Sequence, residues 1–431
     1  MKVVVVGGGA SGFSAAKVAK NCGVEEVTLI ERTDTLGGWA LVSGIGLCGS
    51  GSFSILQEAT ALGGASFYNE IVLPIATHSE LMMPGFDRAM LFNVTKLDAR
   101  MKRNIYESKI NLFLEEKVIK TEIYENKIKS ILLESGKTIE ADVFIDATGS
   151  VTGLDGCEDY GVGCVECIQR CMRFGDPKGL VDEKIKLISS LDANGNKGVT
   201  GTSYLIPIAS LSLKLQKQVQ SNGFAYIEVP ENIKPDINRG KKAGSHSMSI
   251  MSQPIIKNNI LLADIGGFVK VTANAAPRYA NSLRQIEGLE DIVISQPLSG
   301  HKGHAVEGLA IAPRDNKMRV EGYKNLFCAG IKSSHSLFLL DVSISGDFAG
   351  YNAARYCFGL EPLELSKNLA FGAFTSYVNE LIKSEDGLKK SPQADKKTLT
   401  KLNVFKEDKN EIIENVKKLN LENIFNKQIV V

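Results

Sequence analysis

The sequence has no long apolar run and no excess of charge of either sign. No stretch approaches the roughly 20 apolar residues that a membrane-spanning helix needs. Lysine and arginine number 50 against 49 acidic residues, and the formal net charge is +1. This balance excludes a global field that would attract nucleic acid or an anionic membrane. The start, "MKVVVVGGGASG", breaks into glycines too early for a signal peptide. We therefore expect a cytoplasmic protein without a membrane partner.

Several catalytic motifs are also missing. The chain contains neither an HExxH motif nor a Ser-His-Asp arrangement, and histidine occurs only five times. Only one Gly-x-Gly-x-x-Gly is followed by the pattern of a nucleotide-binding helix, so a separate NAD(P)H domain is not expected. With 431 residues, 44% hydrophobic and 23% charged, the chain has the composition of a globular protein of two or three domains.

The N-terminal segment is typical of a dinucleotide-binding unit. Val3–Val6 form a β-branched run, as expected for a strand buried on both faces. Gly7, Gly9 and Gly12 follow at the spacing that permits a tight turn, close approach of a pyrophosphate and close helix packing. A small-residue helix and a second strand then lead to Glu31, at the right distance to accept a hydrogen bond from a ribose hydroxyl. The segment therefore predicts dinucleotide binding.

Three later segments decide which dinucleotide is expected. Gly37 and Gly38 come soon after the acid, in "ERTDTLGGWA". A β-meander pattern precedes a strand that ends in "ATG" at residues 147–149, and another strand ends at the "AG" of residues 329–330. In this order, the three motifs resemble the FAD-binding proteins of the glutathione-reductase type, including the glucose-inhibited division protein A group.

The resemblance implies that FAD is the cofactor and indicates which residues contact it. A backbone contact to adenine is implied at Val118, and a helix that begins near Ser345–Gly346 is implied to point at the flavin. Ile331 departs from the family pattern, in which an acid or an amide follows the "AG". The implied cofactor-binding residues are Gly7, Gly9, Ala10, Ser11, Gly12, Glu31, Arg32, Gly37, Gly38, Val118, Ala147, Thr148, Gly149, Gly330, Ile331, Ser345 and Gly346.

The expected fold class is α/β, with a discontinuous Rossmann-like FAD-binding domain at residues 1–155 and 310–360. An inserted α+β domain at residues 156–309, with parts of 40–95, is expected to bind the substrate. Residues 361–431 are helical by periodicity, with lysines and acids in near balance. Such a charge run indicates a solvated helical face, with RNA or partner binding as the alternative.

Four cysteines lie within fifteen residues, in "CEDYGVGCVECIQRC". Cys157, Cys164, Cys167 and Cys171 follow the spacing C-x6-C-x2-C-x3-C. Four thiolates can bind a [4Fe–4S] cluster or a structural zinc ion, and Cys164 with Cys167 can form a redox-active CxxC pair. Simple burial is the fourth interpretation. The whole chain also resembles a group of anaerobe-type FAD-dependent oxidoreductases of unassigned substrate that share this cysteine run.

Other candidates for a place beside the flavin are a thiol and three imidazoles. Cys48 lies in the glycine-rich "SGIGLCGSGS", and His301 and His304 lie in a polar loop before the last flavin segment. His335 follows that segment directly. The alternatives are a small buried residue for Cys48 and a solvated loop for His301 and His304.

The sequence therefore predicts an FAD-dependent oxidoreductase. Its flavin would exchange electrons with the four-cysteine site and with a small-molecule substrate or an electron-transfer partner. A flavin- or folate-dependent RNA-modifying enzyme, with nucleic acid as partner, is the second interpretation, and a protein with purely structural FAD is the third. Homo-oligomerisation stays open.

Overall fold

The protein is described from a computed structural model. The residues that it describes are 1–38, 40–83, 86–149, 151–152, 180, 186–189, 202–233, 259–273, 280–294, 296–297, 308–333, 339–384 and 394–430.

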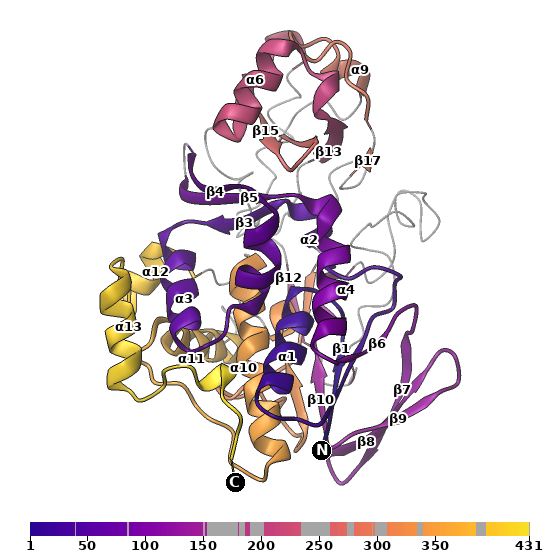
Figure 1. Ribbon diagram of the computed structural model, residues 1–431, viewed down its shortest axis with the longest axis vertical. Coiled ribbons are helices and arrows are strands. Elements are labelled where there is room, and N and C mark those ends of the chain that lie inside the picture. Colours follow the sequence, from indigo (N-terminus) through magenta and orange to yellow (C-terminus); the bar gives the residue numbers. More distant parts are fainter. Residues whose placement is uncertain are drawn as a thin grey trace.

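A five-stranded parallel sheet forms the base of the molecule, with strand order β19-β10-β1-β2-β6 (Figure 1). Its strands are β1 (Lys2–Val6), β2 (Glu26–Ile30), β6 (Asn111–Phe113), β10 (Val143–Asp146) and β19 (Leu326–Cys328). Val3 and Val5 pack into the main core, whereas Val4 and Val6 pack into a second cluster on the other face. The β-branched run is therefore buried on both faces, as the sequence predicts.

Helices cover one face of this sheet and a β-meander covers the other. The helical face carries α1 (Ala10–Asn21) and α10 (Leu339–Cys357), which pack closely along their lengths. The meander consists of β7 (Val118–Tyr124), β8 (Lys127–Leu133) and β9 (Thr138–Glu140). Residues from the start and from the last third of the chain therefore build one helical layer on the sheet.

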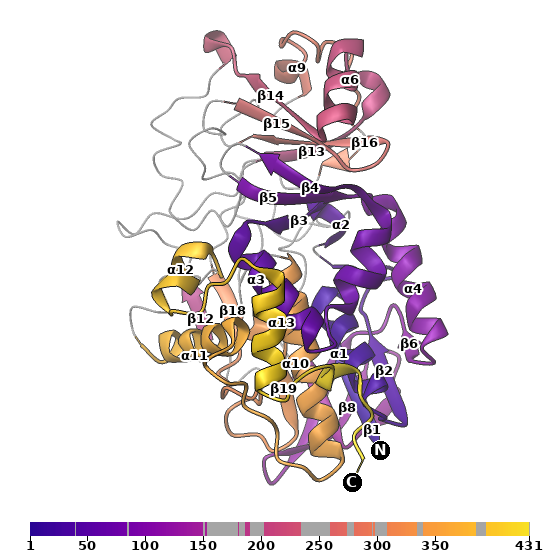
Figure 2. The same cartoon turned by 60° about the vertical axis from the view of Figure 1, so that its left-hand side comes forward.

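A second region lies at the far end of the molecule from the parallel sheet (Figure 2). It is built on an antiparallel sheet of order β14-β15-β16-β13-β17. Its elements are β13 (Thr202–Pro207), α6 (Leu213–Asn222), β14 (Phe224–Glu228), β15 (Asn259–Asp264), β16 (Phe268–Ala273), α9 (Ala280–Leu283) and β17 (Gln296–Pro297). The helix α6 contributes to a separate hydrophobic cluster with one face of the sheet.

A three-stranded antiparallel sheet connects the two regions. It consists of β3 (Ile45–Cys48), β4 (Ala76–Met83) and β5 (Phe86–Phe92), in the order β3-β5-β4. Side chains of β3, β4 and β5 share a hydrophobic cluster with Leu261 and Ala263 of β15. A further small sheet joins β11 (Val151–Thr152), β18 (Gly308–Ile311) and β12 (Lys186–Ser189).

Six further helices belong to the described part of the chain. They are α2 (Ala40–Ser43), α3 (Ser50–Ala61), α4 (Leu97–Glu107), α11 (Ala370–Lys383), α12 (Lys396–Lys401) and α13 (Lys409–Lys418). A π-helical turn spans Phe67–Val72, and short 3₁₀ turns span Leu73–Ile75, Val94–Lys96, Ile208–Ser210, Glu231–Ile233, Gly330–Ser333 and Ile424–Asn426.

The C-terminal segment is bound to the core along one side. In Figure 1 its yellow helices lie beside α3 and α10. Ile412 and Val416 of α13 are buried, as is Phe425 beyond it. The main-chain N–H of Phe425 donates to the carbonyl of Leu62, and that of Ile429 donates to the carbonyl of Cys22. The segment has a solvated face, but its other face is part of the core.

The architecture confirms the predicted α/β class with a Rossmann-like domain. Among the residues that the structure describes, no helix combines the length and apolar character that crossing a membrane requires.

Candidate functional site

The glycine-rich loop between β1 and α1 is the starting point of the site. Gly7 has φ of +108°, and a Cβ there would lie 2.3 Å from the carbonyl oxygen of Ala147. A Cβ on Gly12 would lie 1.8 Å from the carbonyl oxygen of Gly7. A Cβ on Gly9, by contrast, would meet nothing within 4 Å. Two of the glycines are therefore required by the fold, and Gly9 faces open space.

The N-terminus of α1 opens at that same point. Gly9 is its N-cap and carries no side chain that could satisfy the first N–H groups of the helix, including those of Ala10 and Ser11. The first turn contains no acidic residue. The partial positive charge of the helix terminus is thus left available for an anion, as pyrophosphate binding requires.

Glu31 follows β2 at the edge of the same loop. Its Oε2 accepts a hydrogen bond of 2.7 Å from the N–H of Gly8, and its Oε1 accepts one of 3.0 Å from the N–H of Thr33. A carboxylate has about four acceptor sites, so these bonds orient Glu31 and leave capacity for a hydroxyl donor. Arg32, the next residue, is exposed.

The glycine pair lies directly against the loop. The N–H of Gly37 donates to the carbonyl of Gly8 at 2.9 Å, and Gly37 forms a parallel bridge with Gly9. A Cβ on Gly38 would lie 3.4 Å from the Cα of Gly9. The second glycine motif of the sequence is therefore in contact with the first, and both border the open space at Gly9.

The end of β10 supplies a third edge. Ala147 follows β10, and its N–H donates to the carbonyl of Val6 at 2.8 Å. The hydroxyl of Thr148 donates to Oδ1 of Asp146 at 2.7 Å, and Gly149 has φ of +76° with open space where a side chain would stand. Asp146 is buried, and the sequence did not single it out.

The segment after β19 closes the site beside α1. The N–H of Ala329 donates to the carbonyl of Asp146, which aligns β19 with β10. Gly330 has φ of +70°, and a Cβ there would lie 2.4 Å from Oγ of Ser11. The 3₁₀ turn Gly330–Ser333 therefore lies against the first turn of α1. Ile331, which replaces the expected polar residue, is half-buried in this turn.

The predicted start of the last helix is wrong. The structure already contains α10 at Leu339, so Ser345 and Gly346 lie inside the helix. The hydroxyl of Ser345 accepts from the N–H of Gly330 at 2.7 Å and donates to the carbonyl of Val342. A Cβ on Gly346 would lie 2.1 Å from the carbonyl oxygen of Ser11. These two residues thus hold α10 against Gly330 and α1.

Val118 begins β7, close to the acid. The N–H of Glu116 donates to the carbonyl of Glu31 at 3.0 Å. Val118, two residues after Glu116, pairs with Leu133 of β8. The meander therefore starts beside the end of β2, where an adenine contact is expected.

The remaining described candidate lies in the three-stranded antiparallel sheet. Cys48 is the last residue of β3, where it pairs with Ala89. The glycine-rich stretch around it forms β3 and the start of α3. The candidates that lie outside the described residues are His301, His304, His335, Cys157, Cys164, Cys167 and Cys171. Within the described ranges, no group of three or more His, Cys, Asp and Glu side chains is arranged to hold a metal ion.

A hollow of about 460 Å³ lies elsewhere on the molecule. Its lining includes Asn126, Tyr323 and Lys324. The N–H of Lys324 donates to the carbonyl of Asn126, and β19 begins two residues later. The hollow is thus near the amino-terminal ends of the parallel strands, whereas the glycine loops lie at the carboxyl-terminal ends.

Comparison with known proteins agrees with this geometry. Residues 2–152 match a family model described as FAD dependent oxidoreductase. The matched segment is the N-terminal part of the chain. It includes the Gly7–Gly12 loop, Glu31, the glycine pair and β10.

Solved structures share the fold over nearly the whole chain. Two crystal forms of GidA from Aquifex aeolicus match with TM-scores of 0.59 and 0.58, at 17% and 16% identity. Each match covers 97% of this chain, and 76% and 78% of the GidA chains. A flavin-dependent monooxygenase, PieE, in complex with FAD and substrate, matches with a TM-score of 0.50 at 12% identity, over 97% of this chain and 72% of its own. The chain therefore has a GidA-like fold.

The residues present fit an FAD molecule. Open space at Gly9 adjoins an uncapped helix terminus, and Glu31 is oriented at the end of the neighbouring strand. These are the features that a pyrophosphate and a ribose require of a Rossmann-like domain.

Proposed function

We propose that the chain binds FAD along the carboxyl-terminal ends of β1, β2, β10 and β19 and exchanges electrons between the flavin and a small-molecule substrate. The observation that carries this proposal is the open space at Gly9, which is bordered by the N-terminus of α1 and by Gly38. The family match of residues 2–152 supports it.

Each part of the site has a role in this proposal. The first N–H groups of α1 hold the pyrophosphate, and Glu31 accepts from a ribose hydroxyl. Gly37 and Gly38 let the main chain lie close to the cofactor. Val118 offers its backbone to the adenine, and the turn that begins at Gly330 borders the cofactor beside Ser11. FAD, when bound, supplies the electron-transfer chemistry.

We further propose that the four cysteines exchange electrons with the flavin. The support is their spacing, since Cys164, Cys167 and Cys171 use the short steps that iron–sulfur ligand runs use. A [4Fe–4S] cluster is the first form of this proposal. A Cys164–Cys167 dithiol is the second, and a zinc ion would give the site a structural role instead.

The test is an anaerobic preparation of the full chain, with its visible spectrum and assays for iron, zinc and acid-labile sulfide. Flavin bands together with about four iron and four sulfide per chain would support a cluster. Flavin with neither iron nor zinc would replace the cluster by the dithiol, to be checked by thiol titration with and without reductant. A chain that takes up no FAD under these conditions would overturn the whole proposal.

A second experiment addresses the source of the electrons. A second Gly-x-Gly-x-x-Gly, at residues 44–49, lies in the antiparallel strand β3 and not after a parallel strand. We therefore expect NADH and NADPH to reduce the bound flavin slowly, whereas dithionite reduces it fully. Rapid bleaching of the flavin by NADH or NADPH in a stopped-flow measurement would contradict this. Flavin that dithionite fails to reduce would indicate a structural cofactor.

The GidA-like fold favours a second candidate, a flavin-dependent enzyme that modifies RNA. The support is the match over 97% of the chain. The near-neutral net charge counts against it, because RNA affinity depends on basic contacts to phosphates. Filter binding with transfer RNA at two salt concentrations separates the two candidates. Specific, salt-sensitive binding of transfer RNA would support the RNA-modifying candidate. Absence of such binding would rule this candidate out.

A further inference from the structure

The 3₁₀ turn Gly330–Ser333 is attached on two sides. At its start, Gly330 contacts Ser11 and donates its N–H to Ser345. The hydroxyl of Ser333 then donates to the carbonyl of Gly330 at 2.7 Å, which closes the turn on itself. The far end of the turn is therefore bonded directly to the residue that lies against the N-terminus of α1.

Arg314 binds that far end. Its side chain is fully buried, and its Nε donates to the carbonyl of Ser333 at 2.9 Å. Its Nη1 donates to the carbonyl of Asp315 at 3.0 Å, and its Nη2 lies 3.4 Å from the carbonyl of Thr375 on α11. One guanidinium thus joins the cofactor-side turn, the loop before β19 and a helix of the C-terminal segment.

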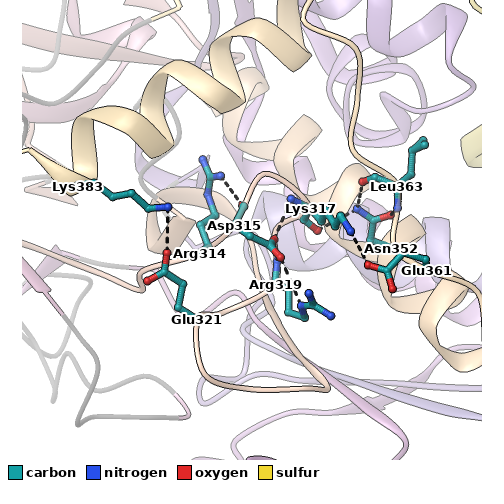
Figure 3. A network of polar contacts seen from close by, with 9 residues as sticks. All are labelled: Arg314, Asp315, Lys317, Arg319, Glu321, Asn352, Glu361, Leu363 and Lys383. Atoms are coloured by element: carbon teal, nitrogen blue, oxygen red, sulfur yellow. Dashed lines mark hydrogen bonds and ion pairs between the residues drawn. The ribbon is translucent and has the colours of Figure 1, made fainter.

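The loop that carries Arg314 is itself fixed from several directions (Figure 3). Asn352 on α10 donates to the carbonyls of Lys317 and Leu363, both at 2.9 Å. Lys317 pairs with Glu361. The Lys383–Glu321 pair, at 3.3 Å, is largely exposed and contributes little to this support. Arg314 is therefore held on a rigid support rather than on a free loop.

Because Arg314 is buried, losing its hydrogen bonds would be strongly unfavourable. Desolvation lowers the pKa of Arg314 to about 10, yet the group stays charged near neutral pH. A buried cation without partners is strongly unfavourable, so the three carbonyls and the guanidinium depend on one another. The Lys332 carbonyl adds a parallel link, since it accepts from the N–H of Ala312 at 2.8 Å.

We propose that Arg314 is a positioning residue for the flavin site. Arg314 holds the turn Gly330–Ser333 against α1 and connects this turn to the C-terminal segment. The proposal rests on the proposed FAD site. Arg314 lies beside the far end of the turn, at Ser333. It acts through Ser333 and Gly330, and it brings a buried positive charge to the side of the site where the turn lies.

The test compares Arg314→Lys and Arg314→Gln with the wild-type chain. Lysine keeps the charge but not the planar fork, and glutamine keeps hydrogen bonding but not the charge. We expect the dissociation constant for FAD, measured by equilibrium dialysis, to rise about tenfold in both, because the turn beside the cofactor loses its anchor at Ser333. We expect the midpoint potential of the bound flavin to become more negative in Arg314→Gln and to stay closer to wild type in Arg314→Lys, because cations stabilise reduced, anionic flavin.

The matched control is Lys383→Met. It breaks the Lys383–Glu321 pair on the same loop, where both side chains are substantially exposed, and touches no residue of the turn. It should leave both the dissociation constant and the potential unchanged. If Arg314→Gln does not fold, Arg314→Lys alone is measured. Lysine keeps a positively charged donor beside the carbonyl groups that Arg314 binds.

Two outcomes would overturn the inference. One is FAD affinity and midpoint potential at wild-type values in both Arg314 variants. The other is a loss of affinity no larger than that of Lys383→Met. The wild-type chain is measured first, so that a failure of FAD binding itself, which would remove the proposed function, is not mistaken for a failure of Arg314.

Discussion

Gly346 on α10 lies directly against the main-chain carbonyl of Ser11 on α1. A Cβ at position 346 would stand 2.1 Å from that oxygen. One helical turn later, a Cβ on Gly350 would stand 2.3 Å from the carbonyl oxygen of Ala15. Two glycines on one face of α10 thus allow the two helices to pack with their backbones in contact.

The first prediction concerns this helix pair. Gly346→Ala is expected to lower the free energy of unfolding by about 1–3 kcal/mol, because the obstructing atom belongs to backbone and the helices must separate. Separation would also shift Gly330, which Ser345 holds, and weaken FAD binding. Urea unfolding of the apoprotein and a dialysis measurement of FAD affinity check both effects. Wild-type stability in this variant would show that the helices can separate at no cost.

The second prediction concerns Gly9, which has the opposite surroundings. Its φ of −73° and ψ of −175° suit any residue, and its Cβ position is open. Gly9→Ala should therefore leave the stability of the apoprotein within about 0.5 kcal/mol of wild type. Because the methyl group would occupy the space proposed for the pyrophosphate, FAD affinity should fall at least tenfold. The same two measurements apply, and unchanged affinity would place the cofactor away from this loop.

The third prediction is a pH dependence of stability. Glu58 on α3 is buried, and its Oε2 and Oε1 accept from the N–H groups of Ala370 and Phe371 at 2.7 and 2.8 Å, at the start of α11. Desolvation raises the pKa of Glu58 to about 7, and it also raises the pKa of buried Asp347 to about 7. A folded-state pKa above the unfolded value means that the folded state binds more protons. The stability that these two carboxyl groups contribute should be highest below about pH 4 to 5, and it should fall as the pH rises through 7.

Urea unfolding between pH 5 and pH 8 measures this slope. Glu58→Gln should reduce the slope by the contribution of one carboxyl group, which is at most about 1.4 kcal/mol per pH unit. Thr60→Ala, at an exposed position of the same helix, is the control and should keep the wild-type slope. A free energy of unfolding that rises steadily from pH 5 to pH 8 in the wild-type chain would contradict the prediction.

The fourth prediction concerns the C-terminal segment. Phe425 is fully buried and lies 5.2 Å from Tyr351 and 6.3 Å from Phe348, between ring centroids. Phe425→Ala is expected to cost about 3–5 kcal/mol, the usual range for a deleted core phenylalanine. Val430→Ala, at a side chain that is 91% exposed, is the control and should cost less than about 0.5 kcal/mol. Equal stability of the two variants would mean that the segment is not part of the core.

The sequence was sufficient to predict the elements whose conformation depends on residues close to them in the chain. The strand Val3–Val6, the helix after Gly9 and the position of Glu31 all follow from β-branching, glycine spacing and small residues. Helix α4 also has a local reason, because Asp98 in its first turn pairs with Lys102 four residues later.

Other features depended on contacts between distant segments, and the sequence could not supply them. Gly266 and Gly267 join β15 to β16, and the pairing of these two strands depends on contacts along their whole length. The start of α10 was placed too late, since Gly346 serves packing against Ser11 rather than a helix terminus. Arg314 has no local motif at all. Its partners come from residues 315, 333 and 375, which meet only in the folded chain.

The order of the strands in the parallel sheet has a consequence for synthesis. The outer strand β19 and the helix α10 come from residues 326–357, and Phe425 and Ile429 bond to Leu62 and Cys22. A nascent chain that has only its first 152 residues therefore has β1, β2, β6 and β10 but lacks a partner for the outer edge of β10 and a cover for α1. Those apolar surfaces stay exposed until translation is nearly finished. Stalled or truncated products of this chain should consequently depend on chaperones far more than the complete protein does.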